Sequence, residues 1–538
     1  MRELDTEILV VGGGLGGVAA ALAAAAHGRR VVLTEETDWL GGQLTAQAVP
    51  PDENPWIERF GSTRTYRELR EGIRGYYRRH YPLRAEAAKH AELNPGAGRV
   101  SKLCHEPRVA KAVIEAILAP HVSAGRIRVL LEHRPVSAHT TGDRVDAVVL
   151  EGEDQVTVRA RYVLDATENG DLLPLTGTEH VTGAEAKSEH GEPHAPDQAD
   201  PANLQGFTYC FAVSHHEGEN HVIDRPEMYG FWRDYQPDFW PGPLLGFVAP
   251  DPRTLDPVKR TFVPNPPGDP LAVSADQSAD AGDKELWAFR RILARGLHTD
   301  GAFASDLTLV NWPLNDYWLK PSHTIPGHTT EADVKTAHHE AKQLSLSVLY
   351  WLQTEAPRAD GGTGFPGLRL RHDVTGTEDG LAKSAYIREA RRIKAVTTVT
   401  EHDVSAEILG VDGRVRREDA VGVGSYRIDL HPSTGGDNYI DVASVPYEIP
   451  LGALLPVRVG NLLPAGKNIG TTHITNGCFR LHPVEWNIGE VAGLLAAFAV
   501  REGVEPREVK TDVRLFEDFA RVLDAAGVER RWPEVRGY

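Results

Sequence analysis

Residues 473–482 bring together side chains that transfer protons, bind anions or act as nucleophiles. His473 and His482 are candidates for a general base, because imidazole exchanges protons near neutral pH. Arg480 lies between them, and its planar guanidinium suits the two oxygens of a substrate carboxylate. Cys478 could be reactive, although a single cysteine is more often a small buried apolar residue. The chain has 23 histidines, so the surroundings of each one must decide its role.

Two other histidine-rich segments raise the question of a metal site. Neither shows the His-Glu-x-x-His spacing or the supporting cysteines of a zinc site. We therefore expect no bound metal. The two segments are His215-His216-Glu217 with His221, and His338-His339-Glu340.

The N-terminal residues predict the strand, turn and helix that bind a dinucleotide. An apolar strand over residues 7–11 leads into Gly12, Gly14 and Gly17, which occupy the G-x-G-x-x-G positions. An alanine-rich helix over residues 18–26 ends at Gly28, and a second strand is expected over residues 30–33. The glycines permit a tight turn, close approach of the backbone to a pyrophosphate and helix–strand packing. Free N–H groups at the helix start face the phosphate charge.

Glu35 supports a dinucleotide site at the N-terminus, and a second glycine motif further along the chain lacks the elements that such a site requires. Glu35 lies 23 residues after Gly12, where a carboxylate accepts hydrogen bonds from a ribose. Gly362, Gly364 and Gly367 match the same spacing, but no strand precedes them and Pro366 obstructs a helix. We therefore predict a loop over residues 362–367 and a dinucleotide site only at the N-terminus.

The residues after Glu35 indicate which dinucleotide is bound. Gly41-Gly42-Gln43 forms a Gly-Gly turn, and Ala166-Thr167 follows a predicted strand over residues 162–164. In both features the sequence resembles the flavoprotein superfamily related to glutathione reductase, in which such segments contribute to the FAD-binding layer. The resemblance implies FAD as the cofactor. No C-x-x-x-x-C pair follows the Gly-Gly turn, which disfavours a dithiol–disulfide reductase.

Motifs in the middle and at the C-terminal end extend the resemblance over most of the chain. They are Arg388-Glu389-x-Arg391-Arg392, Tyr426-x-Ile428-Asp429 and Asn461-Leu462-Leu463-x-Ala465-Gly466. At these motifs the sequence resembles the large bacterial family of FAD-dependent oxidoreductases. The resemblance implies a helix for the first motif and strands for the other two.

The same resemblance implies a helix that begins near Val484 and points its N-terminus at the flavin ring. A helix N-terminus carries about half a positive charge, which stabilises the anion formed when a flavin is reduced. Backbone N–H groups of residues 486–489 are expected to make this contact, with the Glu485 carboxylate turned away from the ring. His473 and His482 would then flank the flavin edge. Cys478 becomes a candidate tether, although we expect FAD to be bound without a covalent link.

The expected site therefore has a catalytic and a cofactor-binding part. The catalytic candidates are His473, Arg480 and His482. The expected FAD contacts come from Gly12, Gly14, Leu15, Gly17, Glu35, Glu36, Gly41, Gly42, Gln43, Val136, Ala166, Thr167, Gly466, Asn487 and Ile488.

Composition and charge disfavour several classes of partner. The formal net charge of −18 argues against nucleic acid and anionic membranes, and the Arg-rich residues 64–84 are interpreted as a solvated helix face. Three widely spaced cysteines indicate a reducing compartment. No apolar run reaches the roughly 18 residues of a membrane span, and the motif at residue 12 leaves no room for a leader peptide. We expect a cytoplasmic protein with a small-molecule substrate and an undetermined oligomeric state.

The order of these segments predicts an α/β protein with an insertion. Residues 1–180 and 451–505 are expected to form a Rossmann-like FAD-binding domain with a parallel sheet, helices and a small β layer. Residues 181–450 are expected to form a mixed α+β substrate domain, and residues 506–538 a helical tail. Within the insertion we expect loops over residues 186–206 and 248–283 and a helix over residues 336–353. Its aromatic residues are more simply explained as core than as a pocket lining.

These features predict an FAD-dependent oxidoreductase, either an oxidase or a dehydrogenase. It would move a hydride from a small organic substrate to flavin N5, and oxygen or another acceptor would reoxidise the flavin, because no second dinucleotide motif is present. Three alternatives remain at this stage. They are an NAD-using enzyme on the same fold, a flavoprotein that uses FAD without net redox change, and a binding protein without catalysis.

Overall fold

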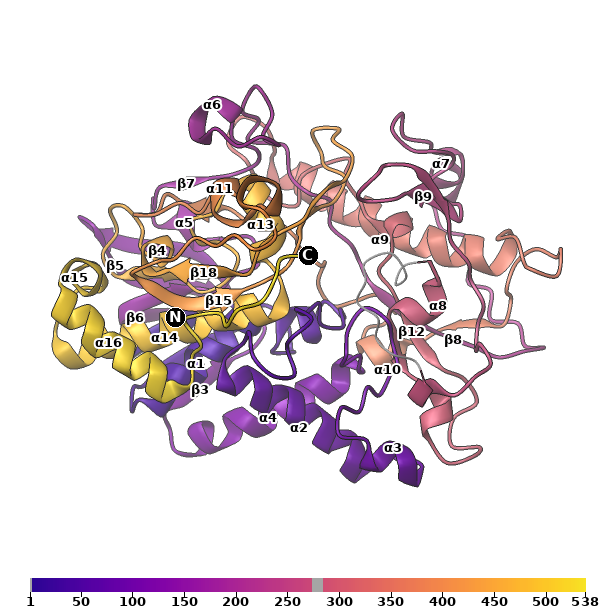
Figure 1. The fold of residues 1–538 in the computed structure, drawn as a ribbon, viewed down its shortest axis with the longest axis horizontal. Coiled ribbons are helices and arrows are strands. Elements are labelled where there is room, and N and C mark those ends of the chain that lie inside the picture. The colour runs from indigo at the N-terminus through magenta and orange to yellow at the C-terminus, as the bar shows by residue number, and fades with distance from the viewer. Residues whose placement is uncertain (1, 273–283) are drawn as a thin grey trace.

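A computed structural model describes residues 2–272 and 284–538 of the chain. Its largest sheet has seven strands in the order β3-β2-β1-β6-β5-β4, and β19 also pairs with β6 (Figure 1). The parallel strands are β1 (Arg2–Val11), β2 (Val31–Thr34), β3 (Ile127–Leu130), β6 (Gln155–Asp165) and β19 (Leu462–Pro464). The antiparallel strands are β4 (Arg134–Thr141) and β5 (Arg144–Glu151). The predicted α/β fold class with a Rossmann-like sheet is confirmed.

Strand β6 joins the two parts of this sheet. One of its edges pairs with β1 from Val156 to Asp165. Its other edge pairs first with antiparallel β5 and then, from Val163 onward, with parallel β19. Residues 162–164 were expected as a strand, but β6 is longer, because pairing with β1 begins at Val156 and continues through the polar residues before Tyr162. Strand β4 was not expected as a strand, because its residues are mostly exposed.

Helices α1 (Leu15–Ala26) and α14 (His482–Glu502) cross at glycines. A Cβ atom on Gly489 would lie 2.0 Å from the Gly16 carbonyl oxygen, and one on Gly493 would lie 2.2 Å from the Ala20 carbonyl oxygen. The two glycines therefore let the helix backbones approach closely. Helix α14 is buried on every face from His482 to Ala499, so it is a central helix instead of one with a single apolar face.

Replacing Gly489 with alanine is expected to destabilise the protein by about 1–3 kcal/mol, because the added methyl group would overlap backbone atoms of α1. Thermal unfolding of the variant would measure the loss. The matched control is Gly503→Ala, at the end of the same helix, where no atom lies within 4 Å of an added Cβ. Alanine at its positive φ of 72° costs about 1 kcal/mol, so the effect of close packing is the loss of stability beyond this value. Equal melting temperatures for Gly489→Ala and the wild type would contradict the close packing.

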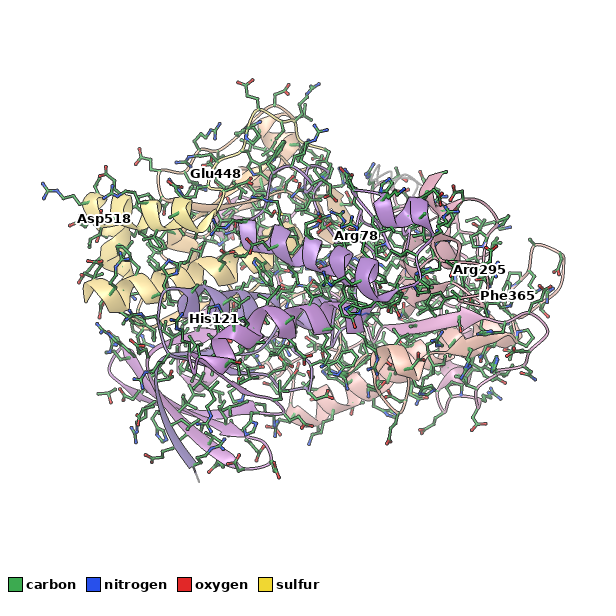
Figure 2. The ribbon with its side chains drawn as sticks, turned by 90° about the horizontal axis from the view of Figure 1, so that it is seen from below. Arg78, His121, Arg295, Phe365, Glu448 and Asp518 are labelled. Atoms are coloured by element: carbon green, nitrogen blue, oxygen red, sulfur yellow. The ribbon has the colours of Figure 1, made fainter. Side chains whose placement is uncertain are left out.

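Helices α2 (Arg64–His80) and α4 (Pro107–Ser123) are in contact, and Figure 2 labels Arg78 on the first and His121 on the second. The interpretation of the Arg-rich segment as a solvated face is wrong for two of its residues. Arg70 and Arg74 are buried, and both pair with Glu58 at 2.6–2.7 Å. Arg70 also pairs with Glu53 at 2.8 Å. These arginines anchor α2 to the loop that follows the Gly-Gly turn.

The middle of the expected insertion contains a four-stranded antiparallel sheet, on the right of Figure 1, whereas β15 (Ala420–Gly424) and β18 (Tyr447–Pro450) of the same expected insertion lie on the left, beside α14. The strands of the four-stranded sheet, in order, are β11 (Arg291–Leu293), β12 (Leu307–Val310), β8 (Phe211–His215) and β13 (Leu368–Leu370). Helix α9 (Glu331–Thr354) begins five residues before the predicted helix, because Thr330 and Asp333 form a capping box. Phe207, Tyr209, Trp232 and Trp240 are buried in one cluster, as expected for core residues, whereas the neighbouring Phe231 is 48% exposed.

The Arg388-Glu389-x-Arg391-Arg392 motif is not helical, contrary to expectation. Only β14 (Arg392–Ile393) forms at its end, in a pair with β7 (His180–Val181). Arg388, Arg391 and Arg392 pair with Asp316, Asp171 and Glu185, respectively. An extended chain directs neighbouring side chains to opposite sides, which lets each arginine reach its own acidic partner.

The remaining elements are short, apart from the C-terminal helix. The Tyr426-x-Ile428-Asp429 motif ends in strand β16, and residues 362–367 form no helix, both as predicted. The predicted loops contain a few short elements, and residues 273–283 of the second loop lie outside the described residues. The helices are α3 (Ala85–Lys89), α5 (Leu172–Leu175), α6 (Lys187–His190), α7 (Tyr229–Asp234), α8 (Leu286–Phe289), α10 (His372–Thr375), α11 (Glu401–Val404), α12 (Ala406–Leu409), α13 (His473–Phe479), α15 (Pro506–Thr511) and α16 (Val513–Ala526). The strands are β9 (Val248–Pro250), β10 (Pro257–Lys259), β15 (Ala420–Gly424), β16 (Ile428–Leu430), β17 (Ile440–Val442) and β18 (Tyr447–Pro450).

None of the helices in residues 2–272 and 284–538 has the length and hydropathy required to cross a bilayer.

Candidate active site

The glycine loop between β1 and α1 has the geometry that a dinucleotide phosphate requires. Gly12 has a φ of 99°, and a Cβ there would lie 2.3 Å from the Ala166 carbonyl oxygen. A Cβ on Gly17 would lie 1.9 Å from the Gly12 carbonyl oxygen. Gly14 is the N-cap of α1 and provides no side-chain cap, so Leu15 starts a helix whose N-terminus can receive a phosphate.

Glu35 lies against this loop, whereas Glu36 is exposed. The Glu35 carboxylate accepts hydrogen bonds from the Gly13 N–H at 2.8 Å and the Thr37 N–H at 2.9 Å. Burial raises the pKa of Glu35 to about 7, and these hydrogen bonds only partly oppose the shift. The predicted ribose-binding acid therefore bonds to the glycine loop itself in this structure.

The Gly-Gly turn packs directly on the glycine loop. Gly41 and Gly42 both have positive φ, and the Gly41 N–H donates to the Gly13 carbonyl at 2.7 Å. A Cβ on Gly42 would lie 2.8 Å from the Gly14 Cα atom. The turn directs Gln43 inward, where its amide donates to the Arg480 carbonyl at 3.0 Å and to the Glu485 carboxylate. Gln43 thus links the glycine loop to the segment that carries the catalytic candidates.

Two carboxylates lie against Gly14, those of the partly buried Glu168 and the buried Glu485. Lys467, which follows Gly466, pairs with Glu168. The Glu485 carboxylate accepts a hydrogen bond from the Gly16 N–H at 3.4 Å, at the start of α1. Burial raises the pKa of Glu485 to about 7, although the attraction of Lys467 opposes the shift. Acidic side chains therefore compete with a phosphate for the α1 N-terminus.

The expected flavin contact of the Trp486–Gly489 backbone differs from the structure. Helix α14 starts at His482, so residues 486–489 lie beyond its first turn, where helical N–H groups bond to carbonyls four residues earlier. The Asn487 side chain instead accepts a hydrogen bond from the Val423 N–H at 3.4 Å, and Ile488 is fully buried. Glu485 points toward α1, as its bond with Gly16 shows.

The segment after β6 lies under the glycine loop. The Ala166 N–H donates to the Val11 carbonyl at 2.8 Å, and the Thr167 hydroxyl donates to the Asp165 carboxylate at 2.7 Å. Burial raises the pKa of Asp165 to about 7. Val136 lies on β4, at an irregularity in its pairing with β5.

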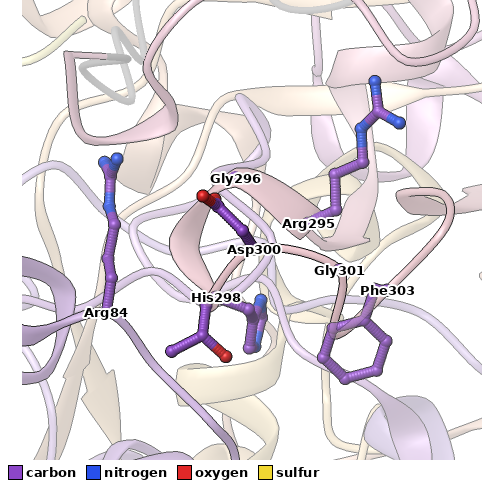
Figure 3. Close-up of a pocket in the computed structure, with 8 residues that line it drawn as sticks. Arg84, Arg295, Gly296, His298, Asp300, Gly301 and Phe303 are labelled. Atoms are coloured by element: carbon purple, nitrogen blue, oxygen red, sulfur yellow. The ribbon is translucent and has the colours of Figure 1, made fainter.

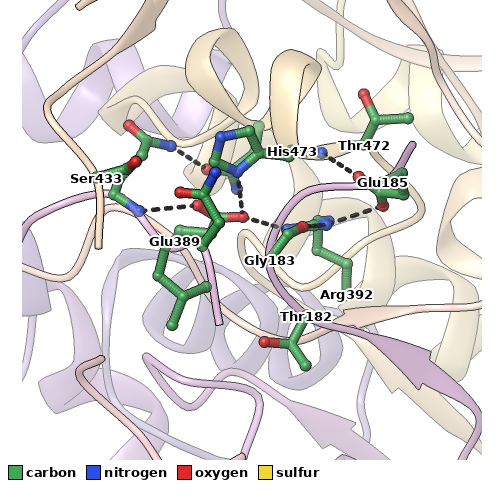
Figure 4. Close-up of polar contacts among 12 residues, drawn as sticks. Thr182, Gly183, Glu185, Glu389, Arg392, Ser433, Thr472 and His473 are labelled. Carbon is green, nitrogen blue, oxygen red and sulfur yellow. Dashed lines mark hydrogen bonds and ion pairs between the residues drawn. The ribbon is translucent and has the colours of Figure 1, made fainter. Parts of the chain in front are cut away.

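His473 belongs to a buried ionic network (Figure 4). Its Nδ1 lies 2.9 Å from Glu389, and Glu389 also pairs with Arg392 at 2.5 Å. Burial opposes charge on His473, but the attraction of Glu389 outweighs it and raises the pKa of the imidazole. The Glu185 carboxylate accepts a hydrogen bond from the backbone N–H of His473 at 2.9 Å and completes the network. A charged imidazole cannot accept a proton, so this pairing does not favour His473 as the base.

His482 lies on the other side of Arg480 in a neutral state. Burial lowers its pKa well below the ordinary value. Its Nδ1 accepts a hydrogen bond from the Asp52 N–H at 3.0 Å, which leaves the proton on Nε2. The buried Nε2 has no hydrogen-bond partner among the described residues. His482 can therefore donate a hydrogen bond from Nε2 to a bound molecule. The Nδ1 lone pair already accepts from the Asp52 N–H, so it is not available to remove a proton from a substrate.

Arg480 lies in a polar cluster that the sequence did not reveal. It donates to the Tyr386 hydroxyl at 2.8 Å and pairs with Asp429 at 3.0 Å. Asp52 lies nearby and is 4% exposed; burial raises its pKa, and the charges of Arg290 and Arg480 oppose the shift. Asp52, Arg290 and Tyr386 belong to no recognisable motif, although Asp52 stands in a Pro-bounded acidic loop soon after the Gly-Gly turn.

Several buried polar atoms of residues near the glycine loop and Arg480 lack hydrogen-bond partners in the described part of the chain, which suits a polar cofactor. Gln43 Oε1, both amide atoms of Gln47, Asn468 Oδ1 and His482 Nε2 are buried and have no hydrogen-bond partner among the described residues. These groups include donors and acceptors, as the polar edge of a flavin ring requires. Together with the uncapped helix, they fit FAD better than an apolar ligand.

The three cysteines are buried and free. Burial raises the pKa of Cys104 and Cys210 to about 12, and that of Cys478 still further. We expect the native protein to be inert toward a thiol-specific chromogenic reagent, whereas the unfolded protein should react at all three thiols. Rapid reaction of Cys478 in the native protein would contradict its buried, protonated state and restore it as a candidate tether.

One surface pocket lies away from this site (Figure 3). It has a volume of about 500 Å³ and is lined by residues that include Arg84, Arg295, His298 and Phe303. None of the predicted site residues lines it. Across residues 2–272 and 284–538, no group of three or more His, Cys, Asp or Glu side chains is arranged to hold a metal.

Comparisons with known proteins identify the family of this chain. A family model described as "FAD dependent oxidoreductase" matches residues 7–523. No curated protein matches the chain.

Solved structures give only distant similarities. A geranylgeranyl bacteriochlorophyll reductase-like protein from Thermoplasma acidophilum is 10% identical, with 98% of this chain and 85% of that chain covered and a TM-score of 0.30. The flavin-dependent brominase Bmp2 is 13% identical over 40% of this chain and 47% of that chain, with a TM-score of 0.25. The flavin-dependent monooxygenase PieE, solved with FAD and substrate, is 15% identical over 40% and 36%, with a TM-score of 0.24. The aligned part thus spans less than half the length of the last two proteins, and no functional detail is taken from these three.

Proposed function

Because the chain belongs to the family of FAD-dependent oxidoreductases, whose model spans residues 7–523, we propose that it removes a hydride and a proton from a small organic substrate. FAD is the cofactor, and when bound it supplies a two-electron acceptor at flavin N5. Oxygen or another acceptor then takes the electrons. The FAD family sets aside the NAD-using alternative. The Gly-Gly turn and Ala166-Thr167 support a further proposal, that the family belongs with the glutathione-reductase-like flavoproteins.

The observation that carries this proposal is the contact between the dinucleotide loop and the polar cluster. Gln43 follows the Gly-Gly turn, and its amide bonds to the Arg480 carbonyl at 3.0 Å. The Arg480 side chain in turn bonds to Tyr386 in the segment after the insertion's sheet. A substrate that reaches Arg480 is therefore held next to the cofactor-binding loop.

We assign proton removal to Asp52. Its carboxylate makes no hydrogen bond to the described residues, and its Oδ2 lies 3.6 Å from Arg290 Nη1. Burial raises the pKa of Asp52, which increases the affinity of the carboxylate for a proton. The His482 imidazole accepts from the Asp52 N–H and fixes this loop. His482 is therefore a positioning residue, and its Nε2–H is free to orient the substrate.

The test is anaerobic reduction of the FAD-containing protein by a panel of alcohols, amines, amino acids and hydroxy acids. A substrate bleaches the visible flavin bands, and Asp52→Asn should slow this reduction by about 10²- to 10⁴-fold while FAD stays bound. Asp306→Asn is the control, because Asp306 pairs with Arg291 away from the cluster. A spectrum that no compound bleaches, or an Asp52→Asn variant with the wild-type rate, would contradict the proposal.

A further inference from the structure

Three buried arginines converge in the polar cluster around Arg480. Arg388 and Arg480 are each 2% exposed, and the Arg290 side chain is 12% exposed. The Arg388 guanidinium lies over the Tyr386 ring at 4.9 Å, and Arg480 donates to the Tyr386 hydroxyl. Asn311 joins Arg290 to Arg388, because its carbonyl accepts from Arg290 at 3.1 Å and its side-chain oxygen accepts from Arg388 at 3.4 Å. We call Arg290, Arg388 and Arg480 the arginine cluster.

The cluster holds more hydrogen-bond donors than the described residues satisfy. The buried donors without an acceptor are Arg290 Nη1, Arg388 Nε, Arg480 Nε and Asn311 Nδ2. Nearly all buried donors in folded proteins find a partner. Four unpaired donors in one cluster therefore point to a missing acceptor, and three of them belong to cationic groups.

The charges of the cluster are also unevenly paired. Arg388 pairs with Asp316 at 2.9 Å, and Arg480 pairs with Asp429 at 3.0 Å. Among residues 2–272 and 284–538, the acidic partner of Arg290 is Asp52, at a separation of 3.6 Å that is too long for a hydrogen bond. A buried cation without a bonded anion is unfavourable, so an anion beside Arg290 is stabilised.

We propose that the arginine cluster binds the carboxylate of an organic acid and that this acid is the substrate of the reaction proposed above. This inference rests on the proposed function. In this arrangement one carboxylate oxygen accepts from Arg290 Nη1 and the other from Arg480 Nε, the donors that lack an acceptor among the described residues. His482, at the start of α14, adjoins Asp52, because its Nδ1 accepts from the Asp52 N–H.

The acidic residues of the cluster favour a carboxylate over a phosphate. Both terminal nitrogens of Arg480 are already bonded, to Tyr386 and Asp429, so Arg480 offers only Nε. Asp52, Asp316 and Asp429 lie close by, and their negative charge opposes a doubly charged ligand. A singly charged group with two oxygens matches the free donors.

The inference is tested by binding of acetate, propionate and benzoate to the FAD-containing protein. Each acid is compared with its amide and with inorganic phosphate. The readouts are a shift of the flavin absorption bands and the melting temperature, because a ligand that binds only the folded state raises it. We expect at least one carboxylate to change both readouts, and we expect its amide and phosphate to bind at least tenfold more weakly.

Variants locate the binding. Arg290→Gln should weaken carboxylate binding by about tenfold to hundredfold, and Arg290→Lys should recover part of it by restoring the charge. Arg291→Gln is the matched control, because Arg291 adjoins Arg290 but bonds to Asp306, Gly96 and Ala97. Its carboxylate affinity should be unchanged even if the variant melts earlier.

Equal binding of acids and amides, tighter binding of phosphate, or wild-type affinity in Arg290→Gln would each overturn the inference. The FAD content of every sample is measured first. A yellow protein that ignores all carboxylates contradicts this inference alone, whereas a protein that cannot be loaded with FAD contradicts the proposed function.

Discussion

Replacing Gly14 with valine is expected to give a folded protein that cannot retain FAD. The backbone of Gly14, with φ −61° and ψ −173°, suits any residue. A Cβ would lie 2.8 Å from the Glu168 carboxylate and 3.4 Å from that of Glu485, and these side chains can move, whereas the Ala166 carbonyl oxygen is at an ordinary contact distance of 3.9 Å. The valine would, however, fill the space through which the backbone approaches the pyrophosphate. We expect FAD affinity to fall at least about 100-fold, equivalent to roughly 3 kcal/mol.

The control for this variant is Gly28→Ala, at the other end of α1. No atom lies within 4 Å of an added Cβ there, and the φ of 79° causes strain of about 1 kcal/mol without reaching the site. Titration with FAD, followed by absorption, compares the two variants, and circular dichroism confirms that both are folded. Wild-type FAD affinity in Gly14→Val would show that the cofactor does not lie against this loop.

Affinity for FAD is expected to fall as the pH rises from about 6 to about 8.5. Burial raises the pKa values of Glu35 and Glu485 to about 7, so both carboxyl groups lose protons in this window. The Glu485 carboxylate then occupies the α1 N-terminus with a full negative charge and repels the cofactor phosphates. Each proton that must be taken up on binding costs about tenfold in affinity per pH unit above the pKa.

Glu485→Gln should remove much of this dependence. We expect the variant to bind FAD about tenfold more tightly than the wild type at high pH and equally well at low pH. Glu490→Gln is the control, because Glu490 lies on the same helix, and burial likewise raises its pKa, but it bonds to Thr65. The measurement is the FAD dissociation constant of each variant over this pH range. Parallel pH profiles for Glu485→Gln and the wild type would show that Glu485 does not cause the pH dependence.

The same shift affects stability, with a definite sign. Between about pH 4.5 and 7 the folded protein keeps a proton on Glu485 that the unfolded chain has lost, so stability falls as pH rises through this window. The loss is complete above pH 7 and amounts to at most about 3 kcal/mol for this group. Glu485→Gln should therefore raise the melting temperature at high pH and change it little at low pH.

Local sequence patterns predicted the cofactor-binding half of the protein well. The order of β1, Gly12–Gly17, α1 and β2 follows from an apolar run, glycine spacing and an alanine-rich helix, all contained in 35 residues. These features are local, so the sequence carries them directly.

The ionic clusters could not be predicted in the same way. Asp52, Arg290, Tyr386 and Arg480 come from four distant segments, and no spacing rule connects them. The Arg388–Arg392 segment has a charge pattern that a helix would accept, yet buried acids from different elements hold it extended. Arg70 and Arg74 were interpreted as part of a solvated helix face. Their shared partner Glu58 lies on a preceding loop, and the sequence does not show that this loop packs against the helix.

The central claim is that FAD binds without a covalent link at the Gly12–Gly17 loop. The most direct measurement is the absorption spectrum of the purified protein after incubation with FAD and removal of the excess, repeated on the supernatant after acid precipitation. We predict the two visible bands of oxidised flavin in the protein and their complete transfer to the supernatant. A protein that remains colourless after incubation with FAD, or colour that stays in the acid pellet, would contradict the claim.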